Sequence, residues 1–370
     1  MKYQQVAESI KNRVNSGEFL ATGIPAEREL AALHGVSYMT ARRAVEQLIA
    51  ERTLARKSNG RIEAITSFAG SPSGRLPSIA FLAPSWRSED IGTYRSAVVK
   101  AASARGLIVK TIVHTDIAER VVTETLIGYD AVFFLPFTDP MPESVIDCIR
   151  KTGRRVIGLN YDLSRYGIPS IVPLPSTSVR RLLDHLASMG HERIHCVNTQ
   201  PIDTVNREWI GQWRLWRSMR GANGTLYDYP EPIGGDPRSV AYELIRRLLS
   251  DDAFDATALL CTTIDCAEGC MRALREAGIT IGGQVSVCTV NSEMRAQYLH
   301  PTMTSVTMID PTPYFAFCLD WILENRTEWQ GPMVLSPIEA PLFIGESTAP
   351  APESRTGHTS MLIESAVNSH

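Results

Sequence analysis

The first fifty residues place apolar side chains at the three- and four-residue spacing of amphipathic helices. A first helix is predicted from Tyr3 to Gly17, and a second begins around Pro25 and ends at Gly35. Ser37 stands where an N-cap would start a third helix. Two short helices joined by a tight turn are the geometry of a helix-turn-helix, so we expect one at this end of the chain.

A β-hairpin is predicted directly after these helices. Segments 54–57 and 61–65 contain strand-forming residues, and Ser58, Asn59 and Gly60 lie between them. An Asn-Gly pair is a strong signal for a tight turn between antiparallel strands. A hairpin at this point of the chain would form the wing of a winged helix-turn-helix.

From residue 78 onward, continuous apolar runs alternate with helical patterns, which is typical of parallel sheets covered by helices on both faces. The predicted strands are Ile79–Leu82, Ile108–Val113, Ala131–Leu135, Val156–Leu159, Ile194–Val197, Ala258–Cys261 and Val285–Val290. The predicted fold class is therefore α/β, with an N-terminal winged helix-turn-helix and a larger domain built on parallel sheets.

Changes in composition mark the expected domain boundaries. Residues 67–77 are rich in Gly, Ser and Pro, which predicts a flexible linker between a DNA-binding domain at 1–66 and a second domain at 78–348. Residues 349–370 are largely polar and contain Pro350, Pro352 and Gly357, so we expect a disordered tail. A chain of 370 residues is long enough for two domains.

The formal net charge of −3 conceals an excess of positive charge near the N-terminus. Between residues 37 and 61 the acidic side chains are Glu46 and Glu51, whereas the basic ones are Arg42, Arg43, Arg52, Arg56, Lys57 and Arg61. A basic patch on a mildly acidic chain indicates a module that binds nucleic acid, attached to a domain with another role.

Two further features of composition narrow the class of protein. Charged residues are scattered through the first twenty positions, where a signal peptide would have its apolar segment, and no apolar run is long enough to span a membrane, so we expect a cytoplasmic location. The seven cysteines are an odd set, and Cys261, Cys266 and Cys270 lack C-x-x-C spacing and a nearby His. We therefore expect small buried side chains rather than disulfides, and no metal or cofactor.

The N-terminal segment resembles the GntR-type winged helix-turn-helix over about residues 3–65. The resemblance is carried, in order, by the run Pro25–Ala31, by Gly35-Val36-Ser37, by Thr40–Val45 and by Leu48. Tyr38 stands where this family usually has Arg, and the wing has the single glycine Gly60 where Gly-x-Gly is common. Both departures concern which operator sequence is bound more than whether DNA is bound.

The expected DNA contacts follow from this geometry. The first turn of a recognition helix faces base edges in the major groove, which places Ser37, Tyr38, Thr40 and Arg42 within reach of bases or adjacent phosphates. Arg42 is the first choice for base readout, because a guanidinium can pair bidentately with guanine. The residues expected to position the wing and neutralise phosphates are Arg28, Arg43, Arg56, Lys57, Gly60 and Arg61. The alternative is that these are ordinary solvated charges.

Residues 78–348 resemble the effector domain of LacI/GalR repressors, which shares its fold with periplasmic sugar-binding proteins. The resemblance is carried by segments 182–194, 267–279, 285–287, 301–306 and 347–348. It includes the Gly190-His191 pair and the Ala277-Gly278-Ile279 turn. The resemblance implies two lobes joined by crossing strands, with a ligand in the cleft at the carboxyl ends of the parallel strands.

The ligand contacts implied by this resemblance lie after successive predicted strands. Asn160 and Asn291 stand where many sugar-binding members have Asp, and an amide still reads a hydroxyl because it both donates and accepts hydrogen bonds. Trp213 belongs to a tryptophan cluster with Trp209 and Trp216, whose spacing fits sugar stacking or core packing. The predicted ligand-binding residues are Ser85, Trp86, Arg87, Phe137, Asn160, Arg207, Trp213, Asp265 and Asn291.

Three other classes of function fit the sequence less well. A pyridoxal-phosphate enzyme needs a lysine for its Schiff base, and the last lysine of the chain is Lys151. No Gly-x-Ser-x-Gly, His-Glu-x-x-His or phosphate-loop motif is present, so an enzyme is not expected. A transport-associated binding protein would have a signal peptide instead of a basic helix-turn-helix, and a purely architectural DNA-binding protein would need no cleft.

The sequence therefore predicts a homodimeric transcriptional repressor that binds double-stranded operator DNA and is released by a small-molecule effector. The resemblance favours a sugar, with pentoses, deoxyhexoses, sugar acids and nucleosides all open. Whether the ligand releases or strengthens DNA binding is not encoded in any of these patterns.

Overall fold

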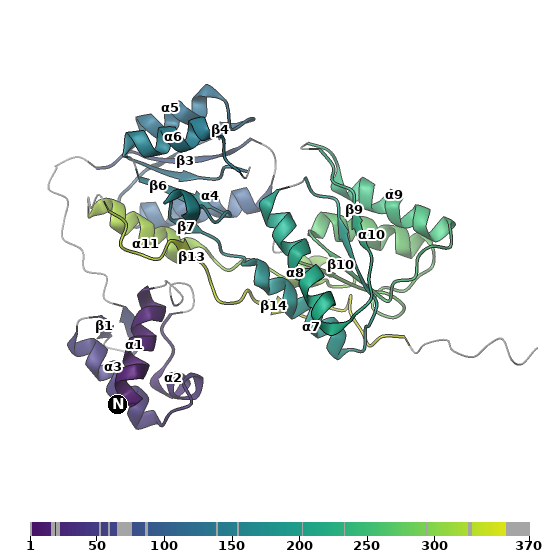
Figure 1. The fold of residues 1–370 in the computed structure, drawn as a ribbon, viewed down its shortest axis with the longest axis horizontal. Coiled ribbons are helices and arrows are strands. Elements are labelled where there is room, and N and C mark those ends of the chain that lie inside the picture. Colours follow the sequence, from purple (N-terminus) through teal and green to yellow (C-terminus); the bar gives the residue numbers. More distant parts are fainter. Residues whose placement is uncertain are drawn as a thin grey trace, which may run out of the picture.

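A computed structural model gives the three-dimensional structure of the chain (Figure 1). It describes residues 2–15, 19, 23–51, 53–57, 60–64, 76–85, 88–137, 140–153, 155–201, 203–232, 234–292, 295–324 and 328–352. The predicted linker at 67–77 and tail at 349–370 fall mostly outside these residues. Within the described residues, no helix combines the length and apolar character needed to cross a bilayer.

The N-terminal unit is a three-helix core with a two-stranded hairpin (Figure 1). Ser37 caps the third helix, since its side chain accepts a hydrogen bond from the Thr40 backbone N–H at 3.3 Å. Gly35 has a φ of 59°, which lets the chain turn sharply between the second and third helices. The elements are α1 (Lys2–Asn15), α2 (Glu27–Leu33), α3 (Tyr38–Ala50), β1 (Leu54–Arg56) and β2 (Ile62–Ala64).

The rest of the described chain forms two lobes, each built on a six-stranded sheet. In the first lobe all strands are parallel, in the order β13-β7-β6-β5-β3-β4. Helices α5 and α6 cover one face, and α4 and α11 cover the other (Figure 1). The elements are β3 (Ile79–Pro84), α4 (Glu89–Ser103), β4 (Val109–His114), α5 (Arg120–Gly128), β5 (Ala131–Phe134), α6 (Glu143–Thr152), β6 (Arg155–Leu159), β7 (Ser170–Ile171), α11 (Thr312–Leu323) and β13 (Val334–Leu335).

The second lobe repeats this plan with the strand order β14-β12-β11-β10-β8-β9, in which only β14 runs antiparallel to its neighbour. Helices α7 and α8 pack together, and so do α9 and α10. The elements are α7 (Val179–Ser188), β8 (Ile194–Asn198), α8 (Thr204–Arg220), β9 (Leu226–Asp228), α9 (Pro237–Ser250), β10 (Ala258–Cys261), α10 (Ile264–Glu276), β11 (Ser286–Thr289), β12 (Thr304–Val306) and β14 (Leu342–Phe343).

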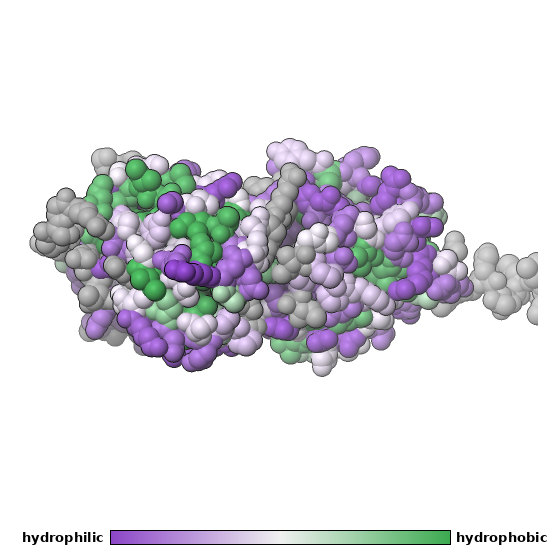
Figure 2. All heavy atoms as spheres, turned by 90° about the horizontal axis from the view of Figure 1, so that it is seen from above, coloured by the Kyte–Doolittle hydropathy of each residue, from purple (hydrophilic) through white to green (hydrophobic). Residues whose placement is uncertain are grey.

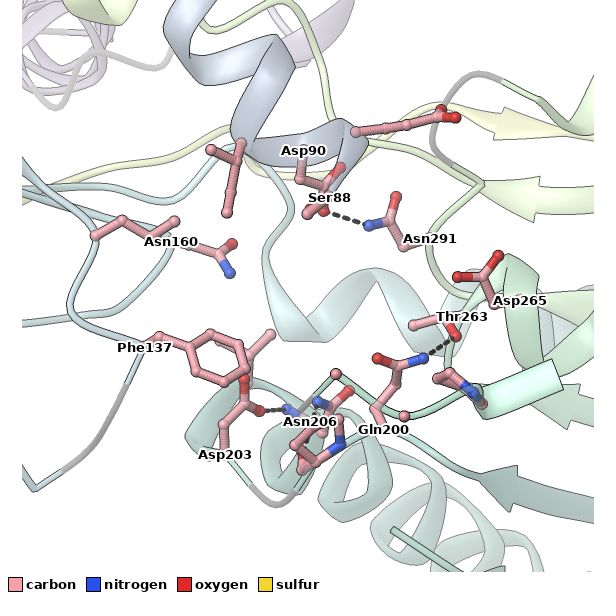
Figure 3. A pocket seen from close by; sticks show the side chains of 18 of the residues that line it. Ser88, Asp90, Phe137, Asn160, Gln200, Asp203, Asn206, Thr263, Asp265 and Asn291 are labelled. Atoms are coloured by element: carbon pink, nitrogen blue, oxygen red, sulfur yellow. Dashed lines mark hydrogen bonds between the residues drawn. The ribbon is translucent and has the colours of Figure 1, made fainter. Parts of the chain in front are cut away.

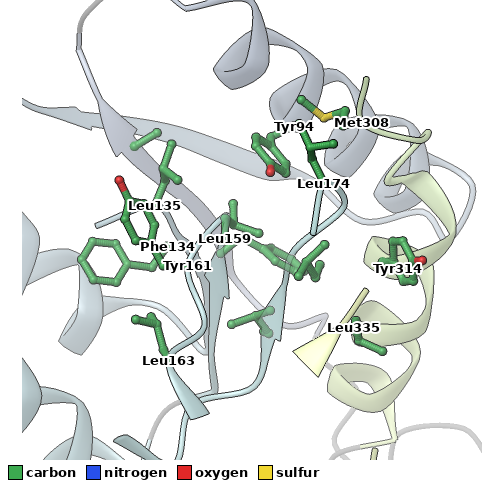
Figure 4. Close-up of a cluster of buried hydrophobic side chains, with 14 of the residues drawn as sticks. Tyr94, Phe134, Leu135, Leu159, Tyr161, Leu163, Leu174, Met308, Tyr314 and Leu335 are labelled. Carbon is green, nitrogen blue, oxygen red and sulfur yellow. The ribbon is translucent and has the colours of Figure 1, made fainter. Parts of the chain in front are cut away.

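Three segments cross between the lobes, at residues 172–178, 307–311 and 336–341. The hydrophobic core follows them, because Leu174 and Met308 of the crossing segments pack in one cluster with the first-lobe residues Tyr94 and Leu159 (Figure 4). The same cluster extends to α7 and α8 of the second lobe. The lobes are therefore joined through a continuous apolar core beside the crossing segments.

The Gly190-His191 pair has a structural role in the second lobe. Gly190 has a φ of 87°, and the buried His191 ring lies 3.1 Å from the Thr257 hydroxyl and 3.0 Å from both the Ser286 hydroxyl and the Ala349 carbonyl oxygen. Burial lowers the pKa of His191, which favours the neutral ring in these hydrogen bonds. Ala349 directly follows residue 348, at which the sequence predicts the domain to end.

Helices α9 and α10 approach closely through Gly269. A Cβ at this position would overlap the backbone carbonyl oxygen of Arg238 and lie 2.9 Å from the Ala241 Cβ. Substitution of Gly269 by alanine is therefore expected to destabilise the protein by about 1–3 kcal/mol, because the two helices must separate. The matched control is Gly211→Ala in α8, where nothing lies within 4 Å and the removal of a helical glycine is expected to stabilise slightly. Denaturant unfolding of both variants tests this, and equal effects would contradict the close approach.

Candidate functional site

A cavity of about 590 Å³ lies between the two lobes, within the size range of small-molecule sites (Figure 3). It is formed by residues that follow the carboxyl ends of β3, β5 and β6 in the first lobe and of β8, β9, β10 and β11 in the second. This is the location at which parallel sheets present loops and helix N-termini to ligands.

Two residues of the first-lobe wall have left-handed backbone conformations. Phe137, after β5, has a φ of 52°, and Asn160, after β6, has a φ of 66°. Such conformations are uncommon for non-glycine residues and gather at functional sites. The Asn160 side chain is held in place because its Oδ1 accepts a hydrogen bond from the Tyr94 hydroxyl at 3.2 Å. Both side chains are thereby directed toward the cavity (Figure 3).

Asp90, in the first turn of α4, brings a buried carboxylate to the same wall. Its Oδ2 accepts a hydrogen bond of 2.6 Å from the Asn291 Nδ2 of the second lobe, whereas its Oδ1 is buried and has no partner among the described residues. Burial raises the pKa of Asp90 to about 6. A buried acceptor without a partner is rare in folded proteins, so a donor from a ligand or water is expected there.

The N-terminus of α8 forms the opposite wall (Figure 3). Asp203 caps this helix by accepting from the Asn206 backbone N–H at 2.7 Å, and it also accepts from the Tyr161 hydroxyl at 2.9 Å. The Asn206 Oδ1 and the Trp209 Nε1 are buried and lack hydrogen-bond partners within the described part of the chain. This wall therefore offers a ligand one acceptor and one donor.

A network of ion pairs borders the cavity on the second lobe. Arg238 contacts the Asp265 carboxylate at 3.0 and 2.8 Å, and Arg295 contacts the same oxygen at 2.7 Å. Glu268 lies 3.1 Å from Arg238 and 3.4 Å from Arg295. The two guanidinium groups are therefore already compensated by two carboxylates, and both contact the Asp265 Oδ1.

Polar contacts between described residues join the lobes across the cleft. They are the Asn291–Asp90 hydrogen bond, the Tyr161–Asp203 hydrogen bond, and a longer ion pair of 3.8 Å between Arg295 and Glu89. Each joins a residue of the first lobe to a residue of the second. A change in the relative orientation of the lobes would have to alter these contacts.

The structure brings together four of the predicted ligand-binding residues, since Phe137, Asn160, Asp265 and Asn291 all line the cavity. Trp86 and Arg87 lie outside the described residues. Ser85 does not line the cavity; it borders a smaller hollow beside β4 and α4. The four lining residues are therefore placed where a ligand in the cavity could reach them. Their contacts with a ligand remain predictions.

Two other predicted residues, both on α8, are absent from the cavity wall. Arg207 is exposed, and its Nη2 lies 3.3 Å from the Thr204 hydroxyl. Trp213 is only 1% exposed and donates its indole N–H to the Ile194 carbonyl oxygen at 3.1 Å, which places it in the core. The tryptophan that lines the cavity is Trp209, one turn earlier. Helical spacing alone does not show which side of α8 faces the core and which side faces the cleft.

Several lining residues were not singled out from the sequence. Asp90 and Asn206 lie in the first turns of helices that follow strands, and a polar residue in that position was the available signal. Arg238 and Arg295 belong to segments that gave no motif. Their role depends on pairing with Asp265 across the fold, which a single sequence does not reveal.

The second candidate surface lies on the N-terminal unit, where α2, α3 and the wing adjoin. The Glu27 carboxylate holds them together, since it accepts a hydrogen bond of 3.3 Å from the Tyr38 hydroxyl and forms an ion pair with Arg56. The predicted DNA-contacting side chains are exposed, except for the half-buried Thr40, whose hydroxyl lies 2.9 Å from that of Ser37.

Several of the basic groups on this surface form ion pairs with carboxylates of the same domain. Arg42 donates to Glu46 at 2.9 Å, one helical turn away, and Lys57 lies 2.6 Å from Glu63. Arg28, Arg43 and Arg61 are also exposed. Exposed ion pairs contribute little to stability, so phosphates or base edges can replace these carboxylates at small cost. Gly60 has a φ of 81° beside the wing turn, a conformation that favours glycine.

Family models match two segments of the chain. Residues 2–63 match bacterial regulatory proteins of the gntR family, and residues 183–309 match the periplasmic binding protein-like domain. A curated relative, described as an uncharacterized HTH-type transcriptional regulator from Streptomyces limosus, is 31% identical over 153 residues, which are 38% of this chain. The chain spans about 40% of the length of that relative.

Solved structures with the same fold cover about three quarters of the chain. A LacI family transcriptional regulator from Enterococcus faecium with bound ribose superposes with a TM-score of 0.61 at 19% identity, covering 74% of this chain and all of the other. The lac repressor dimer bound to operator and an anti-inducer gives a TM-score of 0.59 at 16% identity, covering 75% of this chain and 96% of the other. The predicted fold class and both predicted domain types are confirmed.

Proposed function

We propose that this chain is a non-catalytic transcriptional regulator, which binds operator DNA through its GntR-type winged helix-turn-helix and binds a sugar or sugar-like effector between its two lobes. The observation that carries the proposal is the cluster of buried, unpartnered polar atoms in the cleft, on Asp90, Asn206 and Trp209. An effector would supply the missing hydrogen bonds. Operator binding is consistent with a cytoplasmic location, which forms part of the proposal.

The charge of the cleft supports an uncharged effector rich in hydroxyl groups. Asp90 and Asp203 present carboxylates from the two lobes, whereas Arg238 and Arg295 are compensated by Asp265 and by Glu268. Among the described residues of the cleft, a sugar acid or sugar phosphate would meet repulsion from the carboxylates without an uncompensated cation to offset it. A neutral sugar meets donors and acceptors on both walls, and the nearby rings suit its apolar face.

Effector binding would act on DNA through the contacts that cross the cleft. Tyr161–Asp203 and Arg295–Glu89 depend on the distance between the lobes, and Asn291–Asp90 is adjacent to the unpartnered Asp90 oxygen. A ligand that favours one lobe arrangement shifts the equilibrium by its difference in affinity, typically about 1–3 kcal/mol. We propose that this shift changes the spacing of two winged domains in a dimer and releases the operator.

Exposed apolar residues of the first lobe support the homodimer. Val99 of α4, Ile108 and Val113 beside or within the edge strand β4, and Ile127 of α5 are all exposed, and Ile108 is 86% exposed. Figure 2 shows apolar side chains gathered over this lobe. An apolar surface of this kind on a sheet edge is suited to an interface between two copies, which would present paired winged domains to a palindromic operator.

A ligand screen tests the proposal directly. Neutral pentoses and hexoses are expected to raise the melting temperature of the protein, because ligand bound to the folded state adds stability by mass action. Sugar acids, sugar phosphates and nucleosides of the same concentration serve as the comparison. The sugar with the largest shift should also lower the affinity for operator DNA, measured by fluorescence anisotropy. A shift produced only by anionic ligands, or none across a broad panel, would contradict the proposed effector class.

A further inference from the structure

Three cysteine side chains meet in the core of the second lobe. Cys261 is the last residue of β10, and Cys266 and Cys270 lie one turn apart on α10. All three are fully buried, and their sulfur atoms lie within 4.8 Å of one another. The spacing of these cysteines in the sequence matches no metal-binding motif. They meet because the turn between Cys261 and Cys266 folds α10 back over the end of β10.

The geometry of these sulfurs fits a metal ion bound by three thiolates. Metal–sulfur bonds are about 2.3 Å long, so three sulfurs in a trigonal plane around one ion are about 4.0 Å apart. The Cys261 and Cys270 sulfurs are 3.9 Å apart. The group can therefore close around an ion with shifts of well under an ångström for this pair.

The number of ligands selects the class of ion. Structural zinc takes four ligands in a tetrahedron, and no fourth His, Cys, Asp or Glu joins the group among the described residues. Three soft sulfur ligands instead suit Cu(I), which thiolates select. The sulfurs belong to a buried apolar cluster with Leu259, Ala267 and Leu274, which limits access of water. The oxygen atoms near the group are the Thr199 hydroxyl and the Val197 carbonyl, both beside Cys266.

The position of Cys266 also favours a thiolate. Thr263 caps α10, so Cys266 lies in the first turn, close to backbone N–H groups that stabilise negative charge. We propose that Cys261, Cys266 and Cys270 form a binding site for a soft, thiophilic metal ion of the Cu(I) type. The ion would fix the junction of β10 and α10, next to Thr263 and Asp265 of the cleft wall.

The site is tested by anaerobic titration of the reduced full-length protein with Cu(I) in competition with a chromophoric Cu(I) chelator. Because the thiols are buried, the metal is added both to native protein and during refolding from denaturant. We expect one equivalent of Cu(I) to be retained, with a thiolate-to-metal charge-transfer band in the ultraviolet. Cys270→Ala and, separately, Cys261→Ala should each lower the affinity at least tenfold, because two sulfurs remain.

The matched control is Cys288→Ala, which removes an equally buried thiol of the same lobe outside the group. This variant is expected to retain the band and the affinity of the parent protein. The proposal would be overturned if all three variants lost Cu(I) affinity equally, or if all three kept the affinity of the parent protein. It would also be overturned if neither the native nor the refolded protein retained Cu(I). None of these measurements uses DNA or effector, so the outcome is independent of the proposed function.

Discussion

Substitution of Asp90 by alanine is expected to weaken effector binding about 10- to 100-fold, because a hydrogen bond to a buried charged group contributes about 1.5–3 kcal/mol. The Asp90 Oδ1 is the buried carboxylate oxygen that lacks a partner in the cleft. Loss of the thermal shift caused by the best sugar of the screen, together with calorimetric titration, measures the effect. Operator binding without effector is measured alongside, because Asp90 also accepts a hydrogen bond from Asn291 across the cleft.

The pH dependence of effector affinity gives this prediction a second readout. Burial raises the pKa of Asp90 to about 6, and a ligand hydroxyl donates to the ionised carboxylate. Affinity should therefore be constant above about pH 7 and fall about tenfold per unit below pH 6, where the carboxylate becomes protonated. Asp90→Asn keeps an acceptor but does not titrate, so its affinity should be lower at pH 7 and nearly independent of pH.

The matched control for Asp90 is Asp147→Ala on α6, which removes an exposed carboxylate of the same lobe that pairs with Lys151. Unchanged effector affinity is expected for this variant at every pH. If Asp90→Ala bound the sugar as tightly as the parent protein, or if Asp90→Asn kept the parent's pH profile, the cleft assignment of Asp90 would be wrong.

Local patterns in the sequence were sufficient for the elements that hold the sites. The N-cap at Ser37 and the long apolar strands depend on neighbouring residues and on a fixed period, and both appear where predicted. The strands β7, β13 and β14 have two residues each, which is too short for any period to show. Their place in the sheets is decided by pairing across the fold.

The candidate cleft was predictable to the extent that it follows from topology. Phe137, Asn160 and Asn291 follow the carboxyl ends of parallel strands, so a fold-level argument places them at the cleft. Trp213 satisfies the same helical spacing as Trp209 but turns into the core. The direction in which a helix faces depends on the tertiary packing of α8, which one sequence does not contain.

Contacts between side chains far apart in the sequence were the feature that the sequence predicted least well. Asp265 was predicted as a ligand contact from the resemblance to LacI/GalR effector domains, yet its carboxylate is engaged by Arg238 and Arg295, 27 and 30 residues away in the chain. The cysteine group is more local, because the turn between β10 and α10 brings together sulfurs that no spacing rule connects. The ion-pair network around Asp265, in contrast, follows from packing between segments far apart in the chain.

Substitution of Arg42 by alanine is expected to weaken specific operator binding by about 1–3 kcal/mol, or roughly 5- to 150-fold, and to relax specificity at one base pair. Arg42 is exposed near the start of α3, and without DNA its guanidinium donates to Glu46. Exchanging this partner for a guanine edge should be inexpensive, because an exposed ion pair one helical turn apart contributes little to stability.

Two further variants separate base readout from general electrostatics. Glu46→Ala removes the competing carboxylate while leaving Arg42 in place, so operator affinity should be equal to or higher than that of the parent protein. Arg43→Ala is expected to weaken operator and unrelated DNA alike and to reduce the slope of log affinity against log salt by about 1, as for a phosphate contact. Anisotropy titrations at several salt concentrations measure all three. If Arg42→Ala lost affinity equally for operator and unrelated DNA, with the smaller salt slope, Arg42 would bind phosphate and the base-reading role would pass to another side chain of the first turn of α3.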